Sequence, residues 1–262
     1  MIAADDCSAA KAIAAPPLAL LTLVLAAVAV TPSQLRAAPR DPAAPAVLPR
    51  SRGSKWWLAR HRELLGRVAA VRKKKAAQPA VVFIGDSITS GWDNTGSGVF
   101  ARFYAKRHGI NLGVEGDRTE HVLWRIAHGT LDGLTPRVVV LLIGTNNDAT
   151  HGSADIGRGI VAVVRAIEHK LPRTKVLLLA IFPRDRRPNP RRVKLAHASR
   201  VAARALRRDA RVRFLDIKHA FVGRDGVLSR HVMSDFLHLT GAGYRRWAEA
   251  IEPALKKMLA AR

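Results

Sequence analysis

The chain has 262 residues, of which 48% are hydrophobic and 24% charged, a composition typical of a globular protein and not of a disordered one. A single cysteine, Cys7, excludes an intrachain disulfide and a cysteine-based metal site. The 44 Lys and Arg against 20 Asp and Glu give a formal net charge of +24. Such a charge favours anionic partners such as nucleic acid, acidic polysaccharide or a lipid surface, or it is the solvated surface of an arginine-rich protein.

The amino-terminal segment, residues 1–38, has the pattern of a secretory signal. Residues 18–30 are apolar except for Thr22, which is short for a membrane span and typical of a signal peptide, and Ala37 and Ala38 offer a cleavage site. We expect export to the periplasm or the extracellular space, with a retained membrane anchor or a mis-assigned start as alternatives. Residues 39–54 are proline-rich and are predicted to be a linker, which leaves residues 55–262 for the folded domain.

From residue 55 onward the hydrophobic pattern predicts alternating helices and strands. A helix is predicted at 55–75, and further helices near 118–128, 154–170, 190–209 and 241–259. Strands are predicted at 80–85, 110–113, 137–143, 175–181 and 212–216, three of them as the continuous apolar runs of a parallel sheet. The expected fold class is a doubly wound, flavodoxin-like α/β sandwich of three layers, with about five parallel strands in one sheet.

Four short polar segments lie at the ends of predicted strands or the starts of predicted helices. In chain order they read Gly-Asp-Ser at 85–87, Gly-Val-Glu-Gly-Asp at 113–117, Gly-Thr-Asn-Asn at 144–147 and Asp-Phe-Leu-His at 235–238. Open α/β sheets bind ligands at the carboxyl ends of their strands, so these segments are expected at the functional edge. Together they supply the groups that ester hydrolysis by a serine needs: a nucleophile, donors to an oxyanion, a base and an orienting acid.

Each segment alone also has a structural interpretation. Ser87 is either a nucleophile or the cap of the next helix. Gly116 either presents its N–H to an oxyanion at a helix N-terminus or forms an ordinary turn. Asn146 either donates its side-chain amide to the same oxyanion or turns the chain.

The last segment contains the candidate acid and base. Asp235 and His238 are three residues apart, so one loop presents both groups. Among ten histidines, His231 is the main rival for the base, but it lies before the carboxylate in a less constrained stretch. The sequence contains no HExxH pair and no Cys/His cluster, and neither a metal nor another cofactor is expected.

Four polar neighbours of these candidates are assigned structural roles. Asn147 is expected to form a turn, and Asp148 to have a structural role. Asp117 with Glu120 resembles a loose capping arrangement for the helix predicted near 118.

The four segments resemble the blocks of the SGNH/GDSL hydrolase superfamily. More narrowly, residues 111–125 (Asn-Leu-Gly-Val-Glu-Gly-Asp-Arg-Thr-Glu-His-Val-Leu-Trp-Arg) and 235–244 (Asp-Phe-Leu-His-Leu-Thr-Gly-Ala-Gly-Tyr) resemble the catalytic subunits of platelet-activating-factor acetylhydrolase. The resemblance covers about residues 55–259. It implies Ser87 as nucleophile, His238 as base, Asp235 as its orienting acid, and an oxyanion hole formed by the Ser87 amide, Gly116 and Asn146.

Two positions depart from the family pattern. Ile88 follows the serine where the name-giving motif has leucine, which is a mild change. Glu115 stands where close relatives often have glycine, and it places a carboxylate next to an oxyanion donor. We expect this carboxylate to alter substrate preference or to oppose an anionic acyl group.

The expected function is that of an exported serine esterase that removes short acyl groups, acetyl first, from carbohydrate or cell-envelope esters. A lysophospholipid or other lipid ester is the alternative substrate. The rivals are a non-catalytic binding protein of the same fold and an acyltransferase on the same scaffold. Residues 170–218 contain 16 Lys or Arg against 3 Asp or Glu, so a basic surface for anionic polymers or membranes is expected, and no specific nucleic acid.

Overall fold

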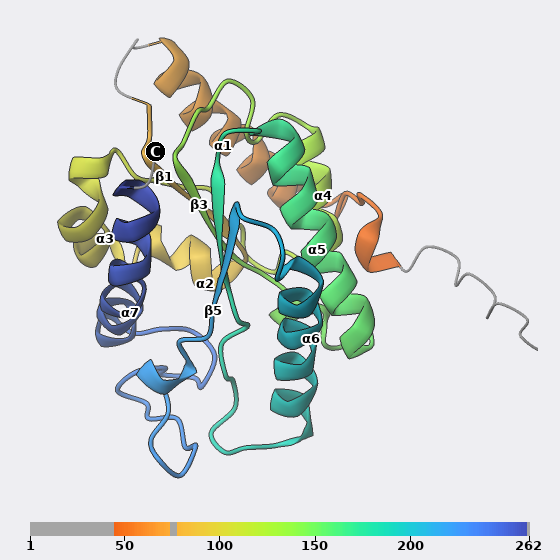
Figure 1. Cartoon of the computed structure of the whole chain (residues 1–262), viewed down its shortest axis with the longest axis vertical. Helices are drawn as coiled ribbons and strands as arrows, with labels where there is room; N and C mark the ends of the chain where they lie inside the picture. The colour runs from red at the N-terminus through yellow and green to blue at the C-terminus, as the bar shows by residue number, and fades with distance from the viewer. Residues whose placement is uncertain (1–44, 74–77, 261–262) are drawn as a thin grey trace, which may run out of the picture. The chain divides into compact units, whose positions relative to one another are not determined.

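The computed structural model describes residues 45–73 and 78–260 (Figure 1). The signal segment predicted at 1–38 and the first part of the predicted linker lie outside the described residues. Within the described part of the chain, no helix is both long and apolar enough to cross a bilayer.

A five-stranded parallel sheet forms the centre of the domain. Its order is β2 (Ile110–Asn111), β1 (Val81–Gly85), β3 (Val138–Leu142), β4 (Lys175–Leu179) and β5 (Val212–Leu215). This 2-1-3-4-5 order is that of a flavodoxin-like fold, with the switch point between β1 and β3. Every residue of β1 and β3 is buried, as the continuous apolar runs predict. The predicted fold class is therefore confirmed.

Helices cover both faces of the sheet (Figure 1). One face packs against α1 (Lys55–Lys73), α4 (Thr119–Ala127), α5 (Ser153–Lys170) and α6 (Pro190–Leu206). The other packs against α2 (Ser87–Ser90), α3 (Ser97–Tyr104) and α7 (Gly241–Ala260). The sequence pattern predicts the five long helices but neither α2 nor α3. Single turns of 3-10 helix complete the chain at η2 (Pro45–Val47), η3 (Gly91–Asp93), η4 (Ala105–Arg107), η5 (Thr145–Asn147) and η6 (Lys218–Ala220).

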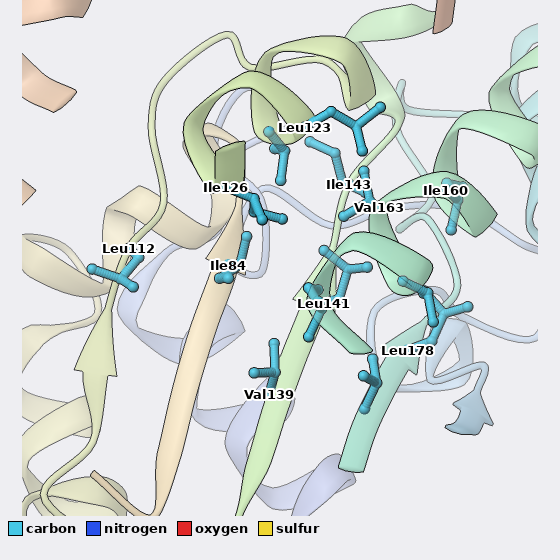
Figure 2. Packing of buried hydrophobic residues seen from close by; sticks show 14 of the residues in the cluster. Ile84, Leu112, Leu123, Ile126, Val139, Leu141, Ile143, Ile160, Val163 and Leu178 are labelled. Carbon is cyan, nitrogen blue, oxygen red and sulfur yellow. The ribbon is translucent and has the colours of Figure 1, made fainter. Parts of the chain in front are cut away.

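The core is divided in two by the sheet, because successive strand residues point to opposite faces. Val82 and Ile84 of β1 enter the cluster under α4 and α5, which Figure 2 shows from close by. Val81 and Phe83 enter the cluster under α3 and α7. With both faces of β1 fixed in this way, the residues that follow it are held rigidly at the carboxyl edge.

β2 is shorter than its prediction at 110–113, but the chain continues alongside β1 beyond it. The Leu112 N–H donates to Phe83 O at 2.8 Å, and the Val114 N–H donates to Gly85 O at 3.1 Å. These two bonds lead the 113–117 segment to the end of β1.

The segment before α1 differs from the linker predicted at 39–54. The helix η2 contacts α4 and α5, and Ala46 is fully buried. The Thr119 hydroxyl donates to Ala46 O at 2.9 Å, and the Arg50 N–H donates to Glu120 O at 2.9 Å. A proline-rich segment forms no hydrophobic core of its own. Residues 45–50 instead pack onto α4 and α5, whose core already exists without them.

Candidate active site

Ser87 is the first residue of α2 and follows β1 after one intervening residue, Asp86. Asp86 caps the helix, since its Oδ1 accepts the Ile88 N–H at 3.0 Å. The serine therefore does not serve as the cap, and its side chain is available. Its Oγ lies 3.0 Å from Nε2 of His238.

His238 is oriented by Asp235. The two side chains meet at 2.7 Å between Nδ1 and Oδ2, and Asp235 Oδ1 accepts the backbone N–H groups of His238 at 2.7 Å and Leu237 at 3.0 Å. Burial by itself raises the pKa of Asp235, but these hydrogen bonds outweigh it and lower the pKa to about 2. The carboxylate thus stays ionised at neutral pH and holds the Nδ1 proton, which leaves Nε2 to accept from Ser87.

The loop that contains Asp235 and His238 is held in place by a contact with the segment after β4. Phe236 and Asp185 both have left-handed backbone, with φ of 61° and 66°. The Asp185 N–H donates to Phe236 O at 2.8 Å, which joins the two. Non-glycine residues hold such a conformation only where their surroundings fix it, so the loop is constrained. His231 is exposed, and its backbone O accepts the Thr240 hydroxyl at 2.5 Å. The structure brings His238, and not His231, to Ser87.

Three N–H groups of these segments are available to a ligand. Among the described residues, the backbone N–H groups of Ser87 and Gly116 have no acceptor. Gly116 has φ of 70°, a left-handed conformation that favours glycine. The Asn146 side-chain amide donates one hydrogen to Asp117 O at 2.9 Å, which fixes the amide beside Gly116 and leaves its second hydrogen available. These are the groups that the family resemblance implies as donors to an oxyanion.

The 113–117 segment is anchored by a buried ion pair. Asp117 is fully buried and accepts Nε of Arg125 and Nε1 of Trp57, each at 2.7 Å. Arg125, also fully buried, donates in addition to Leu112 O at 3.0 Å. At the start of the segment, Gly113 lies so close to α2 that a Cβ there would be 2.3 Å from the Ser90 backbone N. The 113–117 segment and α2 are thereby held together.

The expected capping of α4 by Asp117 and Glu120 is wrong, because Asp117 points inward to its ion pair. The cap comes from two other side chains: His121 Nδ1 accepts the Arg118 N–H at 3.0 Å, and Asn147 Oδ1 accepts the Thr119 N–H at 3.1 Å. Its Nδ2 donates to Glu120 Oε2 at 3.0 Å. Asn147 is fully buried and does more than turn the chain, since it ties the segment after β3 to α4. Sequence reasoning missed Arg125; the available signal was a lone arginine within the apolar stripe of a helix.

Asp148 has the structural role expected of it. Its carboxylate pairs with Arg191 at 2.8 Å and with Lys194 at 3.4 Å.

Two further polar side chains lie near the site: Asp86, which the sequence pattern did not single out, and Arg184, which belongs to the basic segment 170–218. Asp86 is buried with its Oδ2 unpartnered, and burial raises its pKa to about 7, although the Ile88 N–H acts in the opposite direction. Arg184 donates to the Thr145 hydroxyl at 3.4 Å, next to Asn146. In the part of the chain that the structure describes, no group of three or more His, Cys, Asp or Glu side chains is placed to hold a metal ion.

Comparison with known proteins agrees with this geometry. The model of the GDSL-like Lipase/Acylhydrolase family matches residues 83–246, which include all four polar segments. Platelet-activating factor acetylhydrolase IB subunit alpha2 of Homo sapiens is 33% identical over 219 residues, covering 82% of this chain and 92% of that protein. Subunit alpha1 is 34% identical over 204 residues, covering 78% and 84%.

Solved structures share the fold. A GDSL-like lipase from Bacteroides thetaiotaomicron aligns with a TM-score of 0.56 and 25% identity over 74% of this chain and 97% of that one. An acetylxylan esterase from Geobacillus stearothermophilus aligns with a TM-score of 0.54 and 17% identity over 70% and 96%. The extent of the family match and the identity to full-length relatives lead to one conclusion: the chain belongs to the GDSL-like lipase/acylhydrolase family and is an ester hydrolase.

Proposed function

We propose that this protein is a serine esterase that hydrolyses short acyl esters, acetyl above all, through an acyl-enzyme. The observation that carries the proposal is the line of contacts from Asp235 through His238 to Ser87, at 2.7 and 3.0 Å. A base within hydrogen-bond reach of a hydroxyl, itself oriented by a carboxylate, is the arrangement that activates a serine.

The proposed reaction has two steps. Ser87 Oγ attacks the ester carbonyl while His238 Nε2 takes its proton, and the oxyanion accepts hydrogen bonds from Ser87, Gly116 and Asn146. His238 then protonates the leaving alcohol. A water molecule, deprotonated by His238 in turn, releases the acyl group from Ser87.

The cavities of the domain support a polar alcohol as part of the substrate. A hollow of about 330 Å³ beside α2 is lined by Trp56 and by polar and charged groups, Ser90 and Glu115 among them. Two larger cavities, of about 610 and 680 Å³, lie at the opposite edge of the sheet, where both are lined by Lys175 and Met258. A cavity of about 450 Å³ directly after β4, lined by Ile181, Phe182 and Leu195 among others, is the place where a longer acyl chain would fit.

An acetyl ester of a carbohydrate or of a cell-envelope glycan is the proposed substrate. The relatives with 33–34% identity are named acetylhydrolases, and an esterase of acetylxylan shares the fold. The amino-terminal segment 1–38 would take the enzyme to the periplasm or the extracellular space, where such esters occur. A lysophospholipid or another lipid ester is the second candidate, favoured by the word lipase in the description of the matching family.

The test is a series of p-nitrophenyl esters from acetate to octanoate. We expect kcat/KM to be highest for acetate and the Ser87→Ala variant to lose at least about a thousandfold. Ser97→Ala, an exposed serine that starts α3, is the matched control and should behave as the wild type. A Ser87→Ala variant with more than about a tenth of the wild-type rate contradicts the mechanism. A higher kcat/KM for octanoate than for acetate would favour a lipid ester as the substrate. A protein that hydrolyses none of the esters would favour the non-catalytic binding protein.

A further inference from the structure

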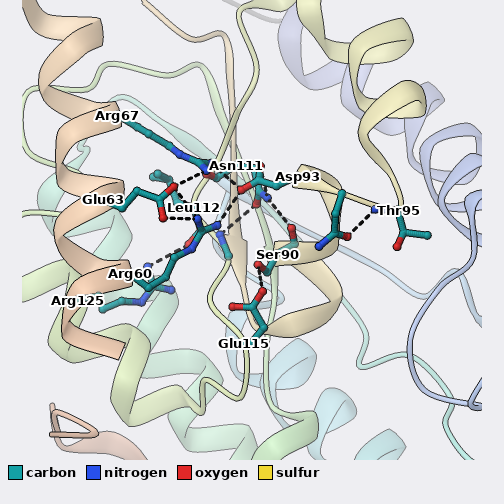
Figure 3. A network of polar contacts seen from close by, with 12 residues as sticks. Arg60, Glu63, Arg67, Ser90, Asp93, Thr95, Asn111, Leu112, Glu115 and Arg125 are labelled. Atoms are coloured by element: carbon teal, nitrogen blue, oxygen red, sulfur yellow. Dashed lines mark hydrogen bonds and ion pairs between the residues drawn. The ribbon is translucent and has the colours of Figure 1, made fainter. Parts of the chain in front are cut away.

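The hollow lined by Ser90 and Glu115 has the features of a binding site for part of the substrate. It has a volume of about 330 Å³ and is formed by one side of α1, by residues that follow the nucleophile, and by Glu115 (Figure 3). Ser90, in its wall, is three residues after Ser87 and so shares a helix face with it. Glu115 directly precedes Gly116. Ser90 and Glu115 therefore connect the hollow to the helix that begins with Ser87 and to the segment that contains Gly116.

Ion pairs hold the walls of the hollow in place. Arg60 and Arg67 both contact Asp93 Oδ2, at 2.8 and 2.7 Å, and both also pair with Glu63 at 2.7 Å. The Asn111 amide donates to the other oxygen of Asp93 at 3.0 Å (Figure 3). Side chains fixed in this way lose little further freedom when a ligand binds.

Glu115 points into the same hollow. Its Oε1 accepts the Ser90 hydroxyl at 2.5 Å, and among the described residues its Oε2 has no partner (Figure 3). Arg52 donates to Glu115 O at 2.6 Å and fixes the backbone at this position. One carboxylate oxygen is thus oriented and available at the border between the hollow and the oxyanion donors.

Trp56 adds an exposed aromatic face. Its side chain is 51% exposed, whereas Trp57, Trp92 and Trp247 are at most 1% exposed. Trp56 also lines the hollow, which neither of the other exposed large apolar residues, Leu48 and Val193, does. An indole that remains open to solvent in a wall of charged groups presents a flat apolar surface to a ligand.

We propose that this hollow binds the sugar moiety of an acetylated neutral saccharide. Trp56 packs against the apolar face of a sugar ring, and Glu115 and the Asp93 network hydrogen-bond its hydroxyls. The inference rests on the proposed esterase function and specifies the alcohol part of its substrate, because an acetyl group is too small to extend from Ser87 into the hollow.

The charges of the hollow select against other alcohols. Arg60 and Arg67 are paired with Glu63 and Asp93, and the Arg52 guanidinium lies 5.8 Å from the centre of the Trp56 ring, so the ring that would hold a quaternary ammonium group already has a cation beside it. Glu115 is the carboxylate of the hollow without an arginine side chain as partner among the described residues, and it opposes an anionic group. An alkyl chain would bury these charges without replacing their hydration. A neutral ligand with many hydroxyl groups has no ammonium group, no anionic group and no alkyl chain, so none of these three objections applies to it.

Binding is tested apart from catalysis in the Ser87→Ala variant, with xylotetraose and N-acetylchitotetraose as neutral probes. Trp56 is the most exposed tryptophan among the described residues, so its occupation should give a saturable change in tryptophan fluorescence. We expect Trp56→Phe in this background to remove the signal, and Glu115→Gly to weaken binding about tenfold. No saturable change with either saccharide at tens of millimolar overturns the proposal.

Catalysis gives the second test, as the ratio of kcat/KM for an acetylated xylo-oligosaccharide to kcat/KM for p-nitrophenyl acetate. We expect Trp56→Ala to lower this ratio about tenfold and Trp56→Phe to restore most of it, since phenylalanine keeps an aromatic face. Leu48→Ala, which removes an equally exposed apolar side chain (50%) elsewhere, is the control and should leave the ratio unchanged.

The outcomes separate this inference from the proposed function. A wild type that hydrolyses p-nitrophenyl acetate, with a ratio that Trp56→Ala does not change, overturns the sugar site alone. Saccharide binding by Ser87→Ala, with no ester hydrolysed by the wild type, overturns the esterase alone. If Trp56→Ala instead lowers selectivity for a choline-containing phospholipid ester, the hollow binds a cation and the sugar proposal is wrong.

Discussion

At the scale of single residues, each role in the candidate site belongs to one side chain. Asp235 accepts three hydrogen bonds, and the one from the His238 ring sets the position of Nε2 before any substrate binds. No other described histidine contacts Ser87, and the exposed His231 is tied to its surroundings through its backbone. The spacing of Asp235 and His238 in the sequence was enough to predict their pairing, because one short loop contains both.

We therefore expect His238→Ala to abolish esterase activity and His231→Ala to leave it within about threefold of the wild type, since loss of the general base removes several orders of magnitude in rate. Both variants are assayed side by side on p-nitrophenyl acetate. An inactive His231→Ala with an active His238→Ala would show that the base is misassigned.

Asp86 predicts a pH dependence of stability. Its pKa is raised from an ordinary 3.8 to about 7 by burial, so the folded state keeps the proton longer than the unfolded state does. The stabilisation from the neutral carboxyl is complete below about pH 4 and is lost as the pH rises toward 7. At about 1.36 kcal/mol per pKa unit, the loss reaches at most about 4 kcal/mol.

Asp86→Asn should remove this component, because the amide can still accept the Ile88 N–H but does not ionise. This component is the difference in the free energy of unfolding between the two proteins, which urea unfolding between pH 4 and 8 measures. We expect the free energy of unfolding of the wild type to fall relative to the variant as the pH rises. A constant difference across this range would show that Asp86 is ionised throughout.

At the scale of elements, α4 holds the oxyanion segment to the sheet through the buried pair of Asp117 and Arg125. The sequence gives only a weak signal for this role, a lone arginine within the apolar stripe of a helix, and Asp117 in the sequence looks like a helix cap. Both α2 and α3 were missed for a related reason. Each is no longer than eight residues, so tertiary contacts rather than helical periodicity decide its structure.

Arg125→Leu should lower the free energy of unfolding by about 3–5 kcal/mol, because it leaves the buried Asp117 carboxylate without a charge partner. Arg102→Ala, an exposed arginine on α3, is the control and should change stability by less than about 0.5 kcal/mol. Adding Asp117→Asn to Arg125→Leu should recover part of the loss, since it removes the isolated charge. A loss below about 1 kcal/mol for Arg125→Leu would mean that the pair does not anchor this segment.

At the scale of the whole molecule, the sequence predicts the parallel sheet and its edge well, because buried strands and strand-end motifs leave strong local patterns. It predicts the distribution of charge poorly. The basic segment 170–218 reaches both edges of the sheet: Arg184 lies beside Thr145, whereas Arg211 and Arg213 line a cavity at the opposite edge. Contacts between distant segments decide which Lys and Arg side chains are already paired with a carboxylate. A count of charged residues does not reveal these contacts.

Near the candidate site, pairing leaves only part of the arginine cluster available. Arg192 donates to the carbonyl groups of Arg184, Asp185 and Gly226, and Arg191 pairs with Asp148. Arg186 and Arg187 are exposed, and among the described residues their side chains have no partner. We propose that this remaining charge guides anionic substrates or polymers toward the site.

Steering of this kind is sensitive to salt, because the Debye length falls from about 10 Å at 0.1 M to about 3 Å at 1 M. We expect kcat/KM on an anionic ester to fall as the salt concentration rises, and kcat/KM on a neutral ester to stay constant. The double variant with Arg186→Gln and Arg187→Gln should show a weaker salt dependence on the anionic ester. An equal response for both esters, together with no retention on heparin or anionic vesicles at low salt, would leave these arginines as a solvated surface.

The central claim is that Ser87 is the nucleophile of this hydrolase. Its most direct test is covalent labelling with diethyl p-nitrophenyl phosphate, which phosphorylates an activated serine, followed by peptide mass mapping and an assay of residual activity. The account predicts a single adduct, on Ser87, that increases in proportion to the loss of esterase activity. Complete inactivation with an unmodified Ser87, or an adduct on another residue, would contradict it.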